Sequence, residues 1–236
     1  TFDLTVMIGT VVTMILVLLL VLPATRGKKM RPRGLQNMME MVLEFTSGIT
    51  KIMMEQKQAA KYLSFALTTF LFVFISNQLG VFVMIGSEAH EPISWLGLTS
   101  DALHQVEGEV NWFKSPTSNI NVTVALAFAI AIYAHFAGIF KGPKQYLSHY
   151  VQPYWWMIFI HIIDEIAKPT THAARLWANI FAGEVLILIL REGMVFLTGV
   201  PLIVWIGFSI FVGTIQAYIF TVLAMVYISQ KTADGH

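Results

Sequence analysis

The sequence predicts an all-α membrane protein, with about five membrane-inserted helices, one amphipathic cytoplasmic helix, and the last two helices forming a long, steeply inclined hairpin. Composition is the first reason, because 56% of the 236 residues are hydrophobic and only 12% are charged. That charged fraction is about half of what a typical soluble domain carries. The second reason is that several apolar stretches approach the roughly 20 residues that a helix needs to cross a bilayer. We therefore expect residues 1–236 to form a single integral membrane domain rather than a soluble enzyme.

Other classes of protein are disfavoured by what the chain lacks. A net charge of +1 argues against nucleic-acid binding, which needs a concentrated excess of Lys and Arg. The chain has no cysteine, which removes disulfides, thiolate metal sites and a Cys nucleophile. Neither a G-x-S-x-G nor a Walker-type phosphate loop occurs, and the run H-I-I-D-E from His161 lacks the second His of a zinc helix. We expect no cofactor and no metal.

Taken in order, the expected elements begin with an N-terminal anchor at 5–22. Basic residues follow this stretch at 26–33, whereas a cleaved signal peptide would carry them before it. The next element, 34–60, places apolar residues on one stripe of a helix and polar residues on its other faces, which predicts an amphipathic helix. This helix either covers its own protein at the membrane interface or forms a docking surface for a partner. Further spans are expected at 62–86 and 120–140, followed by a hairpin at 153–230.

The charges of the loops predict an orientation. Eight of the fifteen Lys and Arg residues lie between 26 and 61, and the loop at 141–152 contains two lysines and no acid. The loop at 87–119 contains five acidic residues and one lysine. By the positive-inside rule, the two basic segments are cytoplasmic and the acidic loop is external. Five crossings then place the N-terminus outside and the C-terminus in the cytoplasm.

The last two apolar regions are too long for upright spans. Residues 155–190 would form a helix of about 54 Å, and covering about 30 Å of hydrocarbon with it would need a tilt of about 55°. Either Pro169 breaks this helix or the helix is steeply inclined. The region at 201–229 is also longer than an upright span needs to be, by a smaller margin.

A polar stripe on the first of these two helices predicts the functional site. Its members recur at steps of three and four residues: His161, Glu165, Lys168, His172, Arg175 and Asn179. A central arginine costs at least about 2.5 to 3.5 kcal/mol in a membrane, so Arg175 is expected to be functional. A structural ion pair with Glu165 or Glu184 is the alternative.

The run E-I-A-K-P-T-T-H-A-A-R-L-W-A-N-I-F-A-G-E from Glu165 resembles the signature of subunit a of rotary F-type ATP synthases. A second match, I-Q-A-Y-I-F from Ile215, lies on the partner helix, and S-P-T-S-N-I-N-V-T from Ser115 is a third. The motifs cover residues 115 to 230, and the first half of the chain resembles the family in topology alone.

This resemblance implies a non-catalytic membrane stator that forms two offset proton half-channels against a rotating ring of c subunits, coupling proton flow to ATP synthesis. Arg175 falls on the family's essential arginine, which faces the buried carboxyl of each c subunit. The other implied partners are the b subunits of the peripheral stalk, the F1 sector indirectly, and lipid, in the plasma membrane of a bacterium. Whether the ion is H⁺ or Na⁺ depends largely on the ring.

Residues of the proton path follow from the same resemblance. Glu184 matches an acidic or His position on the external side, Gln216 neighbours the arginine across the hairpin, and Asn179 lies one turn beyond that arginine. Ser209 is a departure, because relatives often have His or Glu there, so we expect water or Asn77 to complete the external path. For the cytoplasmic side the candidates are Glu165 and, less directly, His172.

Two alternatives come from other classes of protein. A secondary transporter with a broken helix at Pro169 would also contain buried charges, but no second copy of the 165–184 run occurs in the chain. An intramembrane enzyme would need the nucleophile or metal motif that is missing here.

Overall fold

The computed structural model describes residues 3–25, 33–83, 86–88, 109–111, 114–143, 146, 154, 156–193 and 195–232. The described part is built from six helices: α1 (Leu4–Thr25), α2 (Leu35–Met53), α3 (Gln56–Phe82), α5 (Ile120–Lys141), α7 (Met157–Glu192) and α8 (Val195–Thr232). A short helix, η2 (Pro116–Ser118), precedes α5, and two three-residue strands, β1 (Gly86–Glu88) and β2 (Glu109–Asn111), pair antiparallel. Five of these helices, all except α2, are long and apolar enough to span a membrane. The predicted all-α membrane fold is therefore confirmed.

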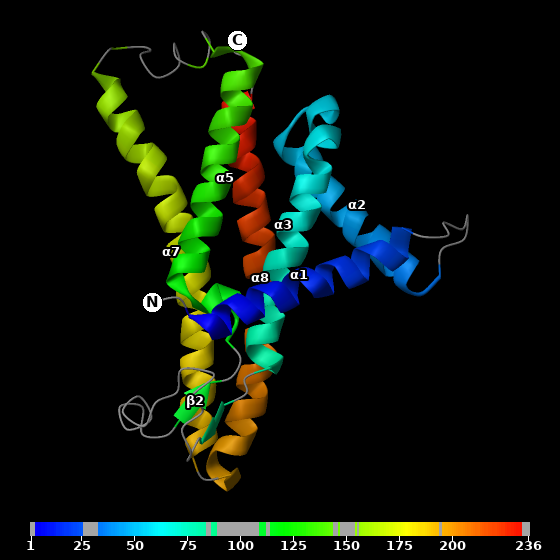
Figure 1. The fold of residues 1–236 in the computed structure, drawn as a ribbon, viewed down its shortest axis with the longest axis vertical. Helices are drawn as coiled ribbons and strands as arrows, with labels where there is room; N and C mark the ends of the chain where they lie inside the picture. The colour runs from blue at the N-terminus through cyan, green and yellow to red at the C-terminus, as the bar shows by residue number, and fades with distance from the viewer. Residues whose placement is uncertain are drawn as a thin grey trace.

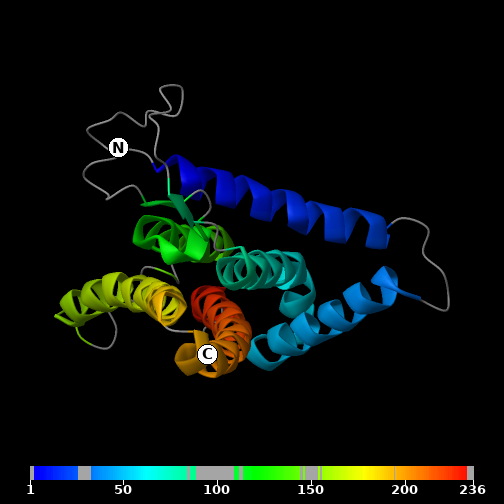
Figure 2. The ribbon, with the colours of Figure 1, turned by 90° about the horizontal axis from the view of Figure 1, so that it is seen from below.

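The helices form one group of four, with the first two helices beside it. Figure 1 shows α3, α5, α7 and α8 running roughly along one another, whereas α1 runs across them at a wide angle. In Figure 2, α1 and α2 diverge from this group and form its outer edge. A bilayer that α1 crosses upright would therefore be crossed obliquely by α7 and α8, as their lengths of 36 and 38 residues also require.

Helix α7 is continuous from Met157 to Glu192, with Pro169 inside it. The broken helix that the sequence allowed as one option is therefore wrong. Proline removes one backbone hydrogen bond of a helix and bends it, and Figure 1 shows α7 changing direction along its length. Because the helix does not break, its full length must be accommodated by inclination.

The boundary between α2 and α3 differs from the prediction of a helix at 34–60 and a span at 62–86. Helix α2 ends at Met53, α3 begins at Gln56 and ends at Phe82, and Met54 between them is extended, with φ of −143°. Met54 is 7% exposed and belongs to the core. The Ser229 hydroxyl of α8 donates a hydrogen bond of 2.6 Å to the Met53 carbonyl. These long-range contacts fix the break, and no Gly or Pro marks it in the sequence.

Small residues allow α8 to pack closely against α3. The Asn77 amide donates a hydrogen bond of 2.9 Å to the Gly213 carbonyl, and a Cβ atom on Gly213 would lie 3.3 Å from the Asn77 Cβ. Ala217 and Ala224, one and three turns further along α8, are fully buried. Such close packing of backbones is typical of helix pairs in membranes, and it fixes the position of α8 relative to α3.

Candidate functional site

Arg175 lies near the middle of α7 with its side chain on an exposed face, while the adjacent Leu176 is fully buried. Within the part of the chain that the structure describes, its guanidinium makes no hydrogen bond or ion pair. In particular it pairs with neither Glu165 nor Glu184, so the structural ion pair considered for it is not formed. An arginine in a membrane span is costly unless it has a partner. Arg175 therefore presents a charge to whatever lies beside α7.

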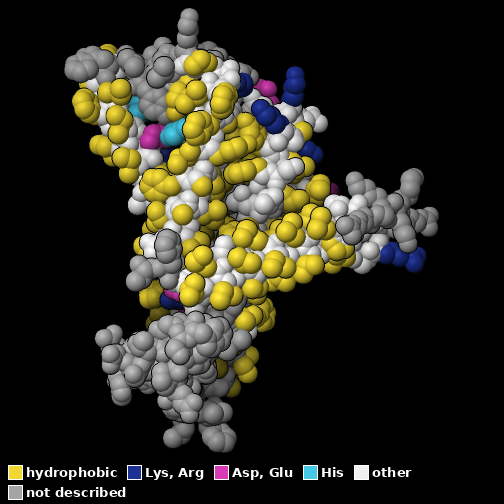
Figure 3. Space-filling view, in the orientation of Figure 1, with side chains coloured by type: hydrophobic (Ala, Val, Ile, Leu, Met, Phe, Trp, Pro, Cys, Tyr) yellow, Lys and Arg dark blue, Asp and Glu magenta, His cyan; other side chains and the backbone are white. Residues whose placement is uncertain are grey.

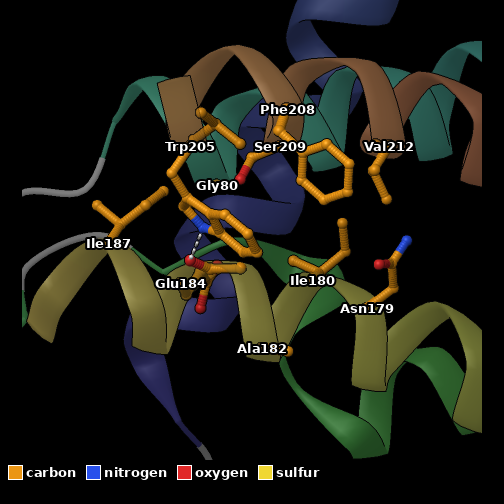
Figure 4. A pocket seen from close by; sticks show the side chains of 13 residues that line it. Gly80, Asn179, Ile180, Ala182, Glu184, Ile187, Trp205, Phe208, Ser209 and Val212 are labelled. Carbon is orange, nitrogen blue, oxygen red and sulfur yellow. Dashed lines mark hydrogen bonds between the residues drawn. The ribbon is translucent and has the colours of Figure 1, made fainter. Parts of the chain in front are cut away.

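On one side of Arg175, α7 and α8 enclose a cavity of about 90 Å³. Figure 4 shows Asn179 of α7 at one end of this cavity and Glu184 at the other, with Ser209 and Trp205 of α8 facing them. The indole Nε1 of Trp205 donates a hydrogen bond of 3.3 Å to the Gly183 carbonyl, which holds the two helices together here. The structure thus brings together three predicted residues, Asn179, Glu184 and Ser209, around one space.

Several buried polar atoms near this cavity have no hydrogen-bond partner among the described residues. They are the Ser209 Oγ, the Asn77 Oδ1, the Gln78 Oε1 and the Ser76 Oγ atoms. Asn77 is linked to the cavity because its amide bonds Gly213, which lines it. Buried polar atoms are normally satisfied by protein or water, and the cavity, although its lining is mostly apolar, is large enough to hold water beside the Ser209 hydroxyl. Water in the cavity would satisfy the Ser209 hydroxyl, which lines it.

Glu184 is surrounded by groups that the sequence did not assign to the site. Its carboxylate lies beside the Ser118 hydroxyl and within electrostatic range of Lys114. A Cβ atom on Gly80 would lie 2.9 Å from the Ser115 Cβ and 3.0 Å from the Glu184 Oε1 atom, so glycine at this position allows Ser115 and the carboxylate to approach α3 closely. The Ser115 hydroxyl anchors η2 to α3 through a 2.7 Å bond to the Ser76 carbonyl. The S-P-T-S-N motif forms η2 beside this end of α3, so it was the sequence feature that could have indicated these neighbours of Glu184.

On the other side of Arg175, Glu165 joins three helices. Its carboxylate is paired with Lys231 of α8 and lies 3.2 Å from the Nε2 atom of His135 on α5. The Nδ1 atom of His135 is in turn 3.0 Å from the Tyr146 hydroxyl. The sequence singled out Glu165 but gave no reason to place His135 beside it. Nothing in the local pattern predicts this cluster, because its members come from segments far apart in the chain.

His172 lies between Glu165 and Arg175 on the stripe and is only 3% exposed. Its ring packs 3.9 Å from the Phe220 ring, between centroids, and neither ring nitrogen has a hydrogen-bond partner in the described residues. Gln216 of α8 is also buried, at 5% exposure, and among the described residues it forms no hydrogen bond with Arg175. The expected contact between Gln216 and Arg175 is therefore not a direct hydrogen bond in the part of the chain that the structure describes.

The Glu165 cluster should contribute measurably to stability. We expect Lys231→Met to lower the free energy of unfolding by about 1 to 3 kcal/mol, because the Glu165 carboxylate loses its partner in a partly buried site. Lys168→Met is the matched control, since Lys168 pairs with the exposed Asp164 on the same helix at 3.7 Å, a contact worth about 0.5 kcal/mol or less. Thermal unfolding of the purified complex would measure both, and equal losses would contradict the assignment.

A long helical hairpin whose central arginine has no partner among the described residues, with a polar cluster on either side of it, is typical of an ion-conducting membrane subunit. The model of the ATP synthase A chain family matches residues 6–229. ATP synthase subunit a from Staphylococcus aureus strains JH9, Newman and USA300 is in each case 40% identical over 244 aligned positions, covering 100% of this chain and 93% of the relative. The chain belongs to the ATP synthase subunit a family, whose members conduct protons as a non-catalytic part of the enzyme. The transporter alternative is not supported.

Proposed function

We propose that α7 and α8 form two proton half-channels that end on opposite sides of Arg175 and face a rotating ring of c subunits. The observation that carries the proposal is the outward-facing Arg175, which lies between two polar clusters and has no ion-pair partner in the described ranges of the chain. A ring carboxylate at about 4 Å would gain about 4 kcal/mol from this charge at an effective dielectric constant of 20. That energy is enough to favour an ionised ring carboxyl beside Arg175, and the same charge prevents protons from passing directly between the half-channels.

The external half-channel is the cavity bounded by Asn179, Glu184 and Ser209. Glu184 receives the proton, and water held by the Ser209 hydroxyl and by Asn77 carries it towards the ring. Because water carries the proton at this point, the path does not need a titratable side chain at Ser209. Each elementary charge that crosses about 100 mV supplies about 2.3 kcal/mol, which the complex converts into rotation.

The cytoplasmic half-channel follows the stripe from Arg175 past His172 to Glu165. The ring nitrogens of His172 support this route, since neither has a hydrogen-bond partner in the described part of the chain and a buried imidazole is costly unless water or a proton reaches it. His135 and Tyr146 extend the polar contacts of Glu165 beyond α7.

The remaining parts of the assembly follow from the same role. In this role the chain lies in the plasma membrane of a bacterium, and its loop charges favour an N-terminus outside and a C-terminus in the cytoplasm. The b subunits of the peripheral stalk hold it against rotation, and through them it is coupled to the F1 sector, which makes ATP.

Glu184→Gln tests the external half-channel. We expect it to slow proton flux through the complex by at least about tenfold, because the amide cannot pass on a proton as the carboxyl can. The complex should remain coupled, since Arg175 still separates the half-channels. Proton flux into vesicles, measured with a pH-sensitive dye, gives the result. Glu44→Gln, the same change on the exposed side of α2, is the control, and equal flux in both variants at every pH would remove Glu184 from the path.

A further inference from the structure

A second and larger cavity lies between the first turns of α3 and the last turns of α5. Its volume is about 380 Å³, and its lining includes Lys61, Tyr62, Tyr133, Phe136, Phe140 and Lys141. None of these residues belongs to the proton path proposed above. The cavity is therefore a separate feature of the molecule that the proton-conducting role does not explain.

One wall of this cavity is aromatic and faces outwards. Phe140 and Phe136 are 84% and 55% exposed, and their rings stack with centroids 6.4 Å apart. Tyr133 stacks on Phe65 at 4.7 Å and meets the buried Tyr62 edge to face at 6.5 Å. This wall follows the side of α5, a predicted span, so it offers a surface along which a hydrocarbon chain can lie.

The mouth of the cavity carries positive charge. Lys61 extends over the Tyr62 ring, 5.5 Å from its centroid, and the Lys141 ammonium at the end of α5 donates a hydrogen bond to the Thr232 carbonyl at the end of α8. No Asp or Glu occurs among the described residues of the lining. Figure 3 shows Lys and Arg side chains gathered near the start of α3, next to an apolar surface. An amphipathic ligand with an anionic head complements this arrangement.

We propose that this cavity binds an anionic glycerophospholipid, with its phosphate between Lys61 and Lys141 and one acyl chain along Tyr133, Phe136 and Phe140. Basic pockets between membrane helices favour anionic headgroups over zwitterionic ones. The aromatic wall accounts for the acyl chain, which a free phosphate ion does not have. A lipid held here would also fill the space where the ends of α3, α5 and α8 meet, and so brace the end of the bundle that contains Glu165.

The test uses the whole ATP synthase complex in liposomes that contain a small fraction of phosphatidylglycerol or phosphatidylcholine with a photoreactive acyl chain. After illumination, mass spectrometry of the peptides locates the adducts. We expect phosphatidylglycerol to label residues 133–140 far more than phosphatidylcholine. Lys61→Gln should reduce that labelling about fivefold, and adding Lys141→Gln should reduce it about fivefold again. Lys57→Gln, the same change one turn earlier on α3, should leave the labelling unchanged.

Three results would overturn the proposal. Equal labelling by the two lipids would show an ordinary lipid-facing groove without headgroup selection. Lipid adducts on a neighbouring subunit and none on residues 133–140 would show that a protein covers the cavity. Loss of the phosphatidylglycerol preference on adding inorganic phosphate would identify a phosphate site. If the double variant fails to assemble, Lys61→Gln alone decides the outcome, because Lys61 is an exposed side chain. The Glu184 test is independent of this one, so failure of either proposal can be recognised.

Discussion

Arg175→Ala is expected to abolish proton pumping driven by ATP hydrolysis, while the complex still assembles. The structure explains both parts of this expectation. The guanidinium has no partner among the described residues, so its removal breaks no internal ion pair and leaves the packing of Leu176 and Ala173 intact. Without the charge, a ring carboxyl loses the roughly 4 kcal/mol that favours its ionised form beside the stator, and protons no longer exchange between ring and half-channels.

Dye quenching in inverted membrane vesicles measures this pumping, and co-purification of the subunits measures assembly. Lys51→Ala, which removes an exposed charge from α2, is the control and should pump normally. Arg175→Lys should recover part of the function at most, because an ammonium retains the charge but lacks the planar fork of a guanidinium. Pumping at the wild-type rate by Arg175→Ala vesicles would refute the mechanism.

Ser209→Leu is expected to have the second largest effect, by closing the external half-channel. Ser209 lines the cavity of about 90 Å³ between α7 and α8, and its hydroxyl has no protein partner among the described residues. A leucine there would fill the space that water needs and would remove the hydroxyl from a lining that is otherwise mostly apolar. A barrier of about 3 kcal/mol to a charge in such surroundings would slow proton entry about a hundredfold.

Ser209→Ala is the matched control, because it removes the hydroxyl without filling the cavity. We expect it to retain most of the proton flux, since water can remain beside Asn77. Both variants would be compared by ATP synthesis in energised vesicles. Similar rates for Ser209→Leu and the wild type would show that protons reach the ring by another route.

The sequence predicted those features that depend on local periodicity and on single costly residues. Hydropathy located the spans, and the excess length of the last two predicted their inclination. The steps of three and four on α7 placed Arg175, Asn179 and Glu165 on one face. A charge in a membrane helix is a strong signal, because its energetic cost is large compared with that of other substitutions.

Long-range contacts were the part that the sequence could not predict. The extended Met54 between α2 and α3 depends on burial and on a bond from Ser229, neither of which leaves a local pattern. His135 and Lys231 meet Glu165 from two other helices, and Lys114 approaches Glu184 from the segment before α5. Such encounters are set by the packing angles of the helices, which a single sequence does not record.

In the proposed mechanism, the cavity at Ser209 is an aqueous path that opens to the external side alone. Because the chain contains no cysteine, Ser209→Cys would introduce a single reactive thiol in this subunit, and Phe211→Cys would do so at a 61% exposed apolar position of α8. Silver ions reach thiols that water reaches, so they can be added to either side of oriented vesicles while proton flux is measured. We expect rapid inhibition of Ser209→Cys by silver from the external side, slow inhibition from the cytoplasmic side, and little inhibition of Phe211→Cys. A Ser209→Cys complex that silver does not inhibit, or inhibits equally from both sides, would contradict this mechanism.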